Sequence, residues 1–149
     1  TGRKVVLAFA GDHAPSFVDH VADKTRTEGN DLQILERSTP FFIWANYPLE
    51  NIDAATSTAD PLNRMDMVML APTIAQQAGL PLTGYYKYLL AMKQQTPVVT
   101  AANDYMKVDG TTGTYGEDES LDAWVKGYLA LEYNNIGAHA KRVQSIFGQ

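Results

Sequence analysis

Asp12 and His13 are neighbours in the sequence and follow directly on an apolar run that ends at Gly11. A carboxylate and an imidazole are both ligands for divalent ions such as zinc and manganese, and both can transfer protons. A metal site usually takes about four ligands, so the remaining ones must come from elsewhere. The alternative is a turn in which Asp12 caps the next helix and His13 is merely exposed. For an isolated Asp-His pair, the residues alone favour the turn.

The element that positions this pair is predicted to be a buried strand. Residues 3–11 form a continuous apolar run with β-branched side chains, which is typical of a strand covered on both faces, as in a parallel sheet. Pro15 then suits the first turn of a helix. In open α/β sheets, ligands collect at the carboxyl ends of strands. Asp12 and His13 would lie at such an end.

The rest of the chain alternates strand and helix patterns, and nothing in it repeats. The predicted fold class is therefore α/β, with residues 1–149 forming a single segment. We expect strands at 3–11, 39–48 and 98–104, helices at 14–26, 64–80 and 82–97, a hairpin around Asp109–Gly110, and one or two helices from Ser120 onward, broken near 134–137.

Capping residues sharpen some of these boundaries. Gly79 is expected to end one helix, and Thr83 is expected to cap the start of the next, which Pro97 stops. Pro72 marks either the start of its helix or a kink in it. The last helical region carries an apolar stripe that we expect to face the core: Leu121, Trp124, Val125, Tyr128, Leu131 and Tyr133.

Composition excludes several classes of function. The net charge of -5 and the lack of a dense basic patch argue against nucleic acid as a partner. The chain has no cysteine, which excludes disulfides, thiolate nucleophiles and Cys-ligated zinc. No apolar run reaches the roughly 20 residues that a membrane span needs. Serine elbows, P-loops and dinucleotide fingerprints do not occur.

Other polar and aromatic residues have structural explanations. His20 is expected on a helix surface, and His139 beside Lys141 and Arg142 suits the last turn of a helix. Thr39–Pro40 and the stretch Trp44–Tyr47 could line a pocket, although aromatic clusters of this kind are more often core. For Tyr85 and Tyr88 we expect packing, with the hydroxyl groups at the surface.

Four stretches in this order resemble one protein family: "AFAGDHAPSF", "TPFFIWANY", "MLAPTIAQQAGLPLTGYYKYLL" and "YLALEYNNIGAHAKR". Together they resemble the C-terminal part of the lipoteichoic-acid-synthase-like phosphoglycerol transferases, which belong to the sulfatase branch of the alkaline phosphatase superfamily. The resemblance covers nearly the whole chain. Related sulfatases carry a His where this sequence has Ser38–Thr39, and that difference favours a transferase.

The resemblance implies a C-terminal portion of an alkaline-phosphatase-like sheet with flanking helices. It also implies a bacterial enzyme on the extracytoplasmic face of the membrane, anchored by upstream transmembrane helices. Such an enzyme moves glycerol phosphate from phosphatidylglycerol to a cell-envelope acceptor through a phosphothreonine beside a divalent ion, typically manganese, with zinc or magnesium as alternatives. Asp12 and His13 match the family's adjacent metal ligands, whereas its threonine nucleophile lies upstream.

A strand pattern is already established by Lys4, so we expect the chain to be a piece of a larger extracytoplasmic catalytic domain. Such a piece should be inactive alone, and its partners should be the upstream half of that domain and a phospholipid headgroup. It should associate with itself or show a large exposed apolar patch. Two alternatives stay open: a free-standing α/β binding module, or a sulfatase or phosphoethanolamine transferase of the same superfamily.

Overall fold

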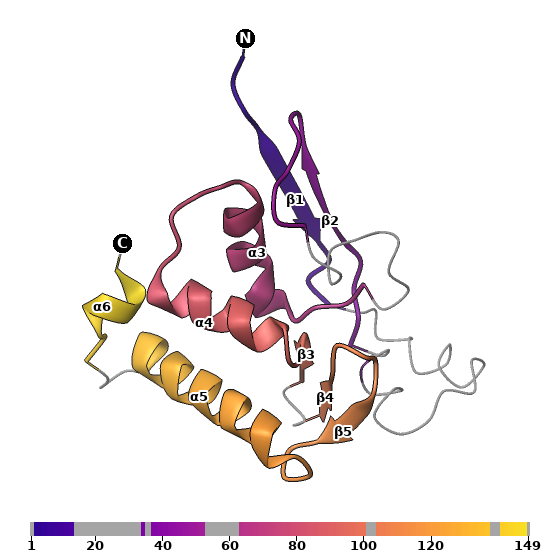
Figure 1. Cartoon of the computed structure of the whole chain (residues 1–149), viewed down its shortest axis with the longest axis vertical. Helices are drawn as coiled ribbons and strands as arrows, with labels where there is room; N and C mark the ends of the chain where they lie inside the picture. Colours follow the sequence, from indigo (N-terminus) through magenta and orange to yellow (C-terminus); the bar gives the residue numbers. More distant parts are fainter. Residues whose placement is uncertain are drawn as a thin grey trace, which may run out of the picture.

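Figure 1 shows the computed structural model of the chain, which describes residues 2–13, 34, 37–52, 63–100, 104–137 and 141–148. The described chain is mixed α and β, with helices beside two small antiparallel sheets. Its elements are β1 (Val6–Ala10), β2 (Phe41–Ala45), the short 3-10 helix η2 (Met67–Met69), α3 (Leu70–Gln77), α4 (Gly84–Lys93), β3 (Val98–Val99), β4 (Asp104–Met106), β5 (Thr112–Thr114), α5 (Glu119–Ile136) and α6 (Gln144–Phe147). The helix expected at 14–26 lies outside the described residues.

β1 and β2 form a two-stranded antiparallel ribbon, with Leu7 opposite Trp44 and Phe9 opposite Phe42. Our expectation of a parallel strand buried on both faces was wrong. Leu7 and Phe9 are each 51% exposed, and Trp44 is 53% exposed. A continuous apolar run shows that a strand is suited to burial, but only the partner strand and the covering elements decide its direction and its exposure.

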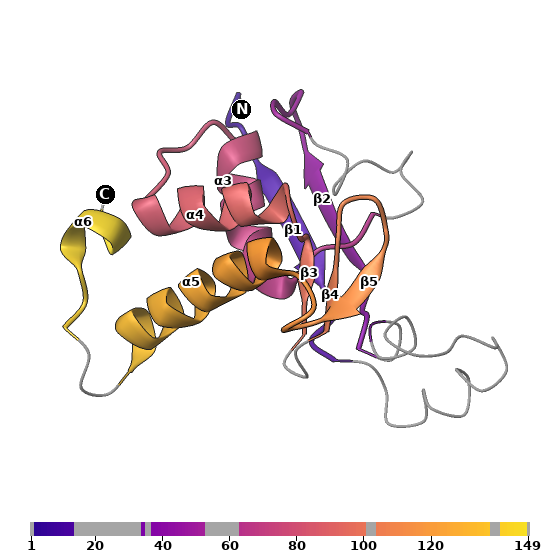
Figure 2. The same cartoon turned by 60° about the horizontal axis from the view of Figure 1, so that its bottom comes forward.

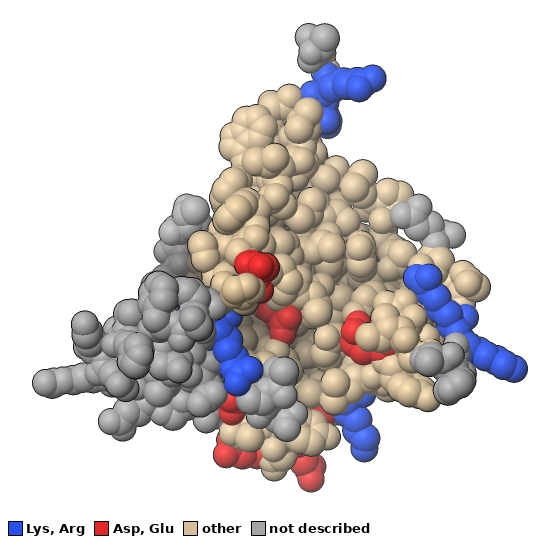
Figure 3. All heavy atoms as spheres, turned by 180° about the vertical axis from the view of Figure 1, so that it is seen from behind, with Lys and Arg blue, Asp and Glu red and all other residues tan. Residues whose placement is uncertain are grey.

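One face of this ribbon is apolar and open. Leu7, Phe9, Phe42 and Trp44 share it because they occupy directly opposed, alternating positions, and we call these four side chains the apolar ribbon face. The Phe9 and Phe42 rings stack with centroids 5.5 Å apart. In Figure 3 the ribbon at the top is uncharged between the basic side chains at its tip and the acidic ones at its base. The expected exposed apolar surface is therefore present.

The helices form a layer in which α4 lies between α3 and α5, as Figure 1 and Figure 2 both show. Its core joins three elements: Met69 from η2, Met92 from α4 and Val125 from α5 are each less than 5% exposed. Met65, Val99 and other half-buried apolar side chains pack against them. The core therefore fixes η2 and β3 relative to the helices.

Local sequence explains where these helices begin and end. The Thr83 side chain accepts a hydrogen bond from Tyr86 N at 3.1 Å, so it caps α4 as expected. Gly79 has φ 70° and follows α3, where Leu80 N donates to Ala75 O at 2.9 Å. Pro72 lies in the first turn of α3 rather than at a kink.

Tyrosines join α4 to α5. Tyr85 donates its hydroxyl hydrogen to Glu132, and Tyr88 donates to the carbonyl oxygen of Trp124 at 2.7 Å. Burial, followed by Glu132, raises the pKa of Tyr85, and burial raises that of Tyr128 to about 12. The two hydroxyl groups, which we expected at the surface, are both hydrogen-bonded to α5.

The predicted hairpin is present as β4 and β5, and its turn is closed by Thr111 N donating to Asp109 Oδ1 at 2.9 Å. β3 pairs with β4 on the other side. Asp118 caps α5 and accepts a hydrogen bond from Lys107 Nζ at 2.8 Å, and this bond is the main cause of its lowered pKa.

α5 ends at Ile136, at the expected break near 134–137. Along its predicted apolar stripe, Leu121 and Val125 are buried, but Tyr133 is 66% exposed. The periodicity was therefore right for the first half of the helix and wrong at its end, where no described element covers that side. None of the helices in the described part of the chain combines the length and the apolar character that a membrane span needs.

Candidate functional site

The end of β1 places Asp12 and His13, and it is tied to the residues that lead into β2. Gly11 N donates to Pro40 O at 3.0 Å, and Thr39 Oγ1 donates to Gly11 O at 2.9 Å. A Cβ atom on Gly11 would lie 2.9 Å from Thr39 Cβ, so glycine permits this close approach. Hydrogen bonds at both the N–H and the carbonyl oxygen of Gly11 therefore fix the backbone immediately before Asp12.

The two predicted ligands lie side by side. Asp12 Oδ2 is 3.4 Å from His13 Nε2, and the side chains are 88% and 79% exposed. Two ligands bonded at about 2.1 Å to one ion lie about 3.4 Å apart in a tetrahedral site and about 3.0 Å apart in the octahedral sites typical of manganese. This donor pair therefore fits tetrahedral coordination directly and octahedral coordination after a small approach of the two atoms. Within the described ranges, no group of three or more His, Asp or Glu residues could complete such a site.

The same geometry also fits a simple turn. His13 N donates to Asp12 Oδ1 at 3.0 Å, so the aspartate binds the backbone of the next residue. The turn, which the sequence leaves open as the alternative to a metal site, is therefore also compatible with the structure. His20 and His139, the other two histidines, lie outside the described residues.

Asp12 also lies at the edge of a cavity that sequence reasoning did not find. The cavity measures about 500 Å³ and lies between the end of β1, the residues before β2, η2 and β3. Thr39 and Pro40 line it, as expected of them, but Trp44–Tyr47 do not, and Trp44 belongs to the apolar ribbon face rather than to a core. The polar part of the wall comprises Asp12, Arg37, Ser38, Thr39, Asn63, Arg64, Asp66 and Thr100.

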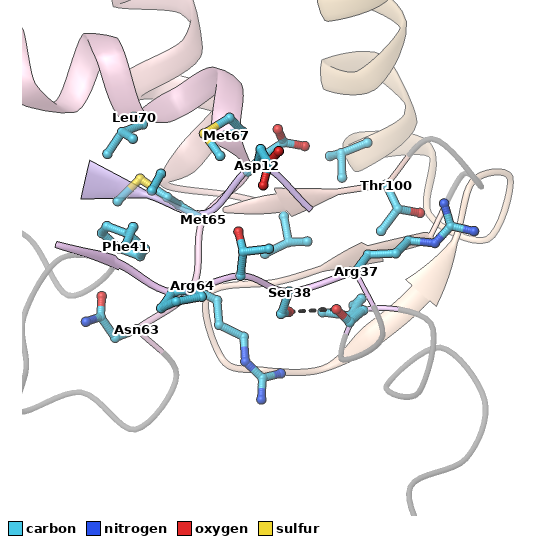
Figure 4. A pocket seen from close by; sticks show the side chains of 17 residues that line it. Asp12, Arg37, Ser38, Phe41, Asn63, Arg64, Met65, Met67, Leu70 and Thr100 are labelled. Atoms are coloured by element: carbon cyan, nitrogen blue, oxygen red, sulfur yellow. Dashed lines mark hydrogen bonds between the residues drawn. The ribbon is translucent and has the colours of Figure 1, made fainter. Parts of the chain in front are cut away.

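Figure 4 shows how these side chains lie around the cavity. Asp12 lies beside Met67, Arg37 extends on the side of Thr100, and Arg64 extends away from Asp12. Arg37 and Asn63 occur in polar stretches of the sequence without a motif, and Arg64 is the first residue of the stretch predicted to be a helix over 64–80. No signal in the sequence alone identifies them, since only the folding of the chain brings the stretches around residues 12, 37, 64 and 100 together.

Asp66 anchors one wall of the cavity. Its carboxylate accepts from Val68 N at 3.1 Å, and its own N–H donates to Pro97 O at 2.7 Å. Burial is the largest influence on its pKa and raises it, against hydrogen bonds from the Val68 and Val99 backbone that lower it. The carboxylate is thus partly desolvated while it holds η2 against β3.

We expect the pH dependence of stability to report this burial. Because the folded-state pKa is raised, the contribution of Asp66 is fully present below its unfolded pKa of about 3.9 and is lost as pH rises through the folded value. Asp66→Asn keeps an oxygen for Val68 N but cannot ionise. In urea unfolding from about pH 4 to about pH 8, the stability of the wild type relative to Asp66→Asn should fall.

Asp66→Ala is the matched variant, because it removes the cap itself and should be about 1 kcal/mol less stable than Asp66→Asn at every pH. A wild type that gains stability over Asp66→Asn as the pH rises would contradict this account. It would show that the ionised carboxylate is favoured by its hydrogen bonds more than it is penalised by burial.

Comparison of the chain with protein-family models, with curated proteins and with solved structures finds no match in any of the three. Inference about function therefore rests on the site itself and on the resemblance of the sequence stretches described above.

Proposed function

We propose that this chain is the C-terminal part of the catalytic domain of a phosphoglycerol transferase of the lipoteichoic-acid-synthase-like family. In this proposal Asp12 and His13 are two ligands of a divalent ion, manganese in the first place. The observation that carries it is the 3.4 Å separation of Asp12 Oδ2 and His13 Nε2 on a well-anchored, exposed strand end. The order of the four family-like stretches supports the same assignment.

The two side chains have distinct tasks in this proposal. Asp12 supplies a hard oxygen donor, and His13 binds through a neutral imidazole nitrogen, so each must be deprotonated. The bound ion would activate the nucleophile and neutralise charge on the transferred phosphoryl group. The exposure of Asp12 and His13 leaves room for the other ligands and for the threonine nucleophile, which we place in the upstream half of the domain.

The exposure of the apolar ribbon face supports the proposal that another part of the protein packs against it. Phe42 is 48% exposed and Trp44 is 53% exposed, on a ribbon only two strands wide. A two-stranded ribbon is marginal by itself, and an uncovered apolar face favours association. We propose that the upstream half of the same domain covers this face, in an alkaline-phosphatase-like sheet. The whole protein would then work at the extracytoplasmic membrane surface on phosphatidylglycerol.

The second candidate is a free-standing binding module, and the hydrogen bond from His13 N to Asp12 Oδ1 favours it, because such turns occur without any metal. The candidates differ in the reaction of the intact protein. A binding module catalyses no reaction, whereas the phosphoglycerol transferase transfers glycerol phosphate. The other members of the superfamily would act on other substrates: a sulfatase on a sulfate ester, and a phosphoethanolamine transferase on a phosphoethanolamine lipid.

The test combines binding with turnover. The intact protein that carries this chain, loaded with manganese, should transfer glycerol phosphate from labelled phosphatidylglycerol, and a chelator should stop the reaction. Calorimetry on the 149-residue chain alone should show only weak manganese binding, because it supplies two ligands. Tight stoichiometric binding by the chain alone, transfer without the upstream part, or turnover of sulfate esters instead would overturn the proposal.

A further inference from the structure

The edge of β1 that faces away from β2 is open. Asn46 N donates to Val5 O at 3.2 Å, so Val5 and every second residue after it direct their backbone groups toward β2. The residues in between direct theirs outward, and in the described part of the chain no strand pairs with them. In Figure 1 the ribbon extends beyond the helices toward the N-terminus. The outward residues, which we call the outer edge of β1, are Val6, Ala8 and Ala10.

The sequence of this outer edge does not protect it against pairing with another strand. Natural edge strands are commonly blocked by a charged side chain, a proline or a bulge. Val6, Ala8 and Ala10 are apolar, they pair with β2 in unbroken register, and Ala8 at the centre is exposed. Leu7 and Phe9 are exposed on the same strand, in the apolar ribbon face. A third strand would bond the outward backbone groups and widen this face.

The charges at the two ends of β1 indicate which strand can be added. Lys4 precedes the strand and Asp12 follows it, and both side chains are exposed. In an antiparallel pair of two β1 strands centred on Ala8, Lys4 of each copy lies opposite Asp12 of the other. Lys4 Nζ lies 4.8 Å from the centroid of the Tyr47 ring, and such exposed contacts are weak. Because opposite charges across two strands attract, a second copy of this chain complements the edge at both ends.

The register of such a pair follows from the backbone and the charges together. The outer edge consists of even-numbered residues, so an antiparallel copy must pair even positions with even positions, with the twofold axis at Leu7, Ala8 or Phe9. An axis at Ala8 places Lys4 opposite Asp12. An axis at Leu7 or Phe9 shifts the two charges apart by two residues. Only the register centred on Ala8 therefore joins the edge hydrogen bonds to the charge pairs.

We propose that two copies of this chain pair antiparallel through the outer edge of β1, centred on Ala8, and form one sheet in the order β2, β1, β1, β2. Leu7 of each copy then lies opposite Phe9 of the other, and the two apolar ribbon faces lie side by side on one surface. The contacts between Lys4 and Asp12 set the register more than the affinity, because exposed ion pairs contribute little. The pairing goes beyond the proposed transferase function and does not depend on it.

The oligomeric state of the 149-residue chain tests this pairing, in the presence of a chelator so that no ion competes with Lys4 for Asp12. Sedimentation equilibrium from about 1 μM to about 1 mM should show a monomer–dimer equilibrium, as expected of a small interface. Ala8→Pro removes an outward N–H at the centre of the edge and should weaken the dimer at least about tenfold. Ala45→Pro makes the same change on the outward side of β2 and should leave the dimer unchanged.

Charge reversal tests the register. Lys4→Glu and Asp12→Lys should each weaken the dimer about tenfold, because each places like charges opposite one another at both ends of the interface. The Lys4→Glu/Asp12→Lys double variant restores opposite charges and should dimerise as the wild type does. Lys87→Glu is the matched control, since it reverses an exposed charge on α4 and should have no effect.

Introduced thiols test the register by a second route, since the chain has no cysteine of its own. In the proposed register, positions 7 and 9 of the two copies form a pair without mutual hydrogen bonds, whose Cα atoms lie about 4.5 Å apart, within reach of a disulfide. Oxidised glutathione should convert the Leu7→Cys/Phe9→Cys double variant into a covalent dimer. The Leu7→Cys and Phe9→Cys single variants report the two neighbouring registers and should stay uncrosslinked.

Four results would overturn the proposal: a monomer at every concentration, equal weakening by Ala8→Pro and Ala45→Pro, a charge-reversed double variant that stays monomeric, or covalent dimers of a single-thiol variant. Circular dichroism confirms that each variant is folded. Because neither turnover nor a metal enters these measurements, phosphoglycerol transfer by the intact protein can fail while the dimer stands, and the reverse also holds.

Discussion

On the proposed metal-dependent transferase function, Asp12→Ala in the intact protein is expected to lower turnover at least about a thousandfold, because the charge stabilisation that a catalytic metal provides is worth several kcal/mol and each 1.4 kcal/mol is about a factor of ten. Stability should hardly change. The Asp12 side chain is 88% exposed, and its described contacts are an ion pair and a hydrogen bond with its neighbour His13.

The measurement pairs initial rates at saturating manganese with urea unfolding of the same samples. Glu50→Ala is the matched control, since it removes an exposed carboxylate that does not line the cavity, and it should keep the wild-type rate. An Asp12→Ala protein that unfolds under assay conditions would instead support a capping role. A rate within about tenfold of the wild type would show that Asp12 is not a ligand of the proposed catalytic metal.

Met69→Ala should be the most destabilising single change among the core residues discussed above, by about 2–5 kcal/mol. Met69 is fully buried at the centre of the cluster formed with Met92 and Val125, and these three come from η2, α4 and α5. Truncation leaves a cavity where three elements meet, and the surrounding helices can collapse only partly to fill it.

Met67→Ala is the matched control, because Met67 belongs to the same short helix but is 49% exposed. In urea unfolding its loss should stay within about 1 kcal/mol. Equal destabilisation by the two variants would show that the core does not lie where η2 meets α4 and α5.

Local signals predicted most element positions. The cap at Thr83, the glycine after α3 and the Asp109 turn each act through contacts within a few residues, so the sequence alone contains the information that specifies them. The direction of β1 was mispredicted because it depends on contacts with a distant segment of the chain. Its partner β2 lies some thirty residues further along, and an apolar run reads the same in a parallel or an antiparallel pair.

For the candidate site, the sequence by itself determined that Asp12 and His13 are adjacent after a strand, and adjacency sufficed to place two ligand-type side chains together. Only the tertiary structure decided that Arg37, Asn63 and Arg64 join Asp12 around one cavity, and that Leu7 and Trp44 are exposed together. The physical reason is the separation along the sequence of the residues that interact. Caps, turns and neighbouring ligands depend on spacing along the chain, whereas a cavity and an open sheet face depend on how distant segments pack.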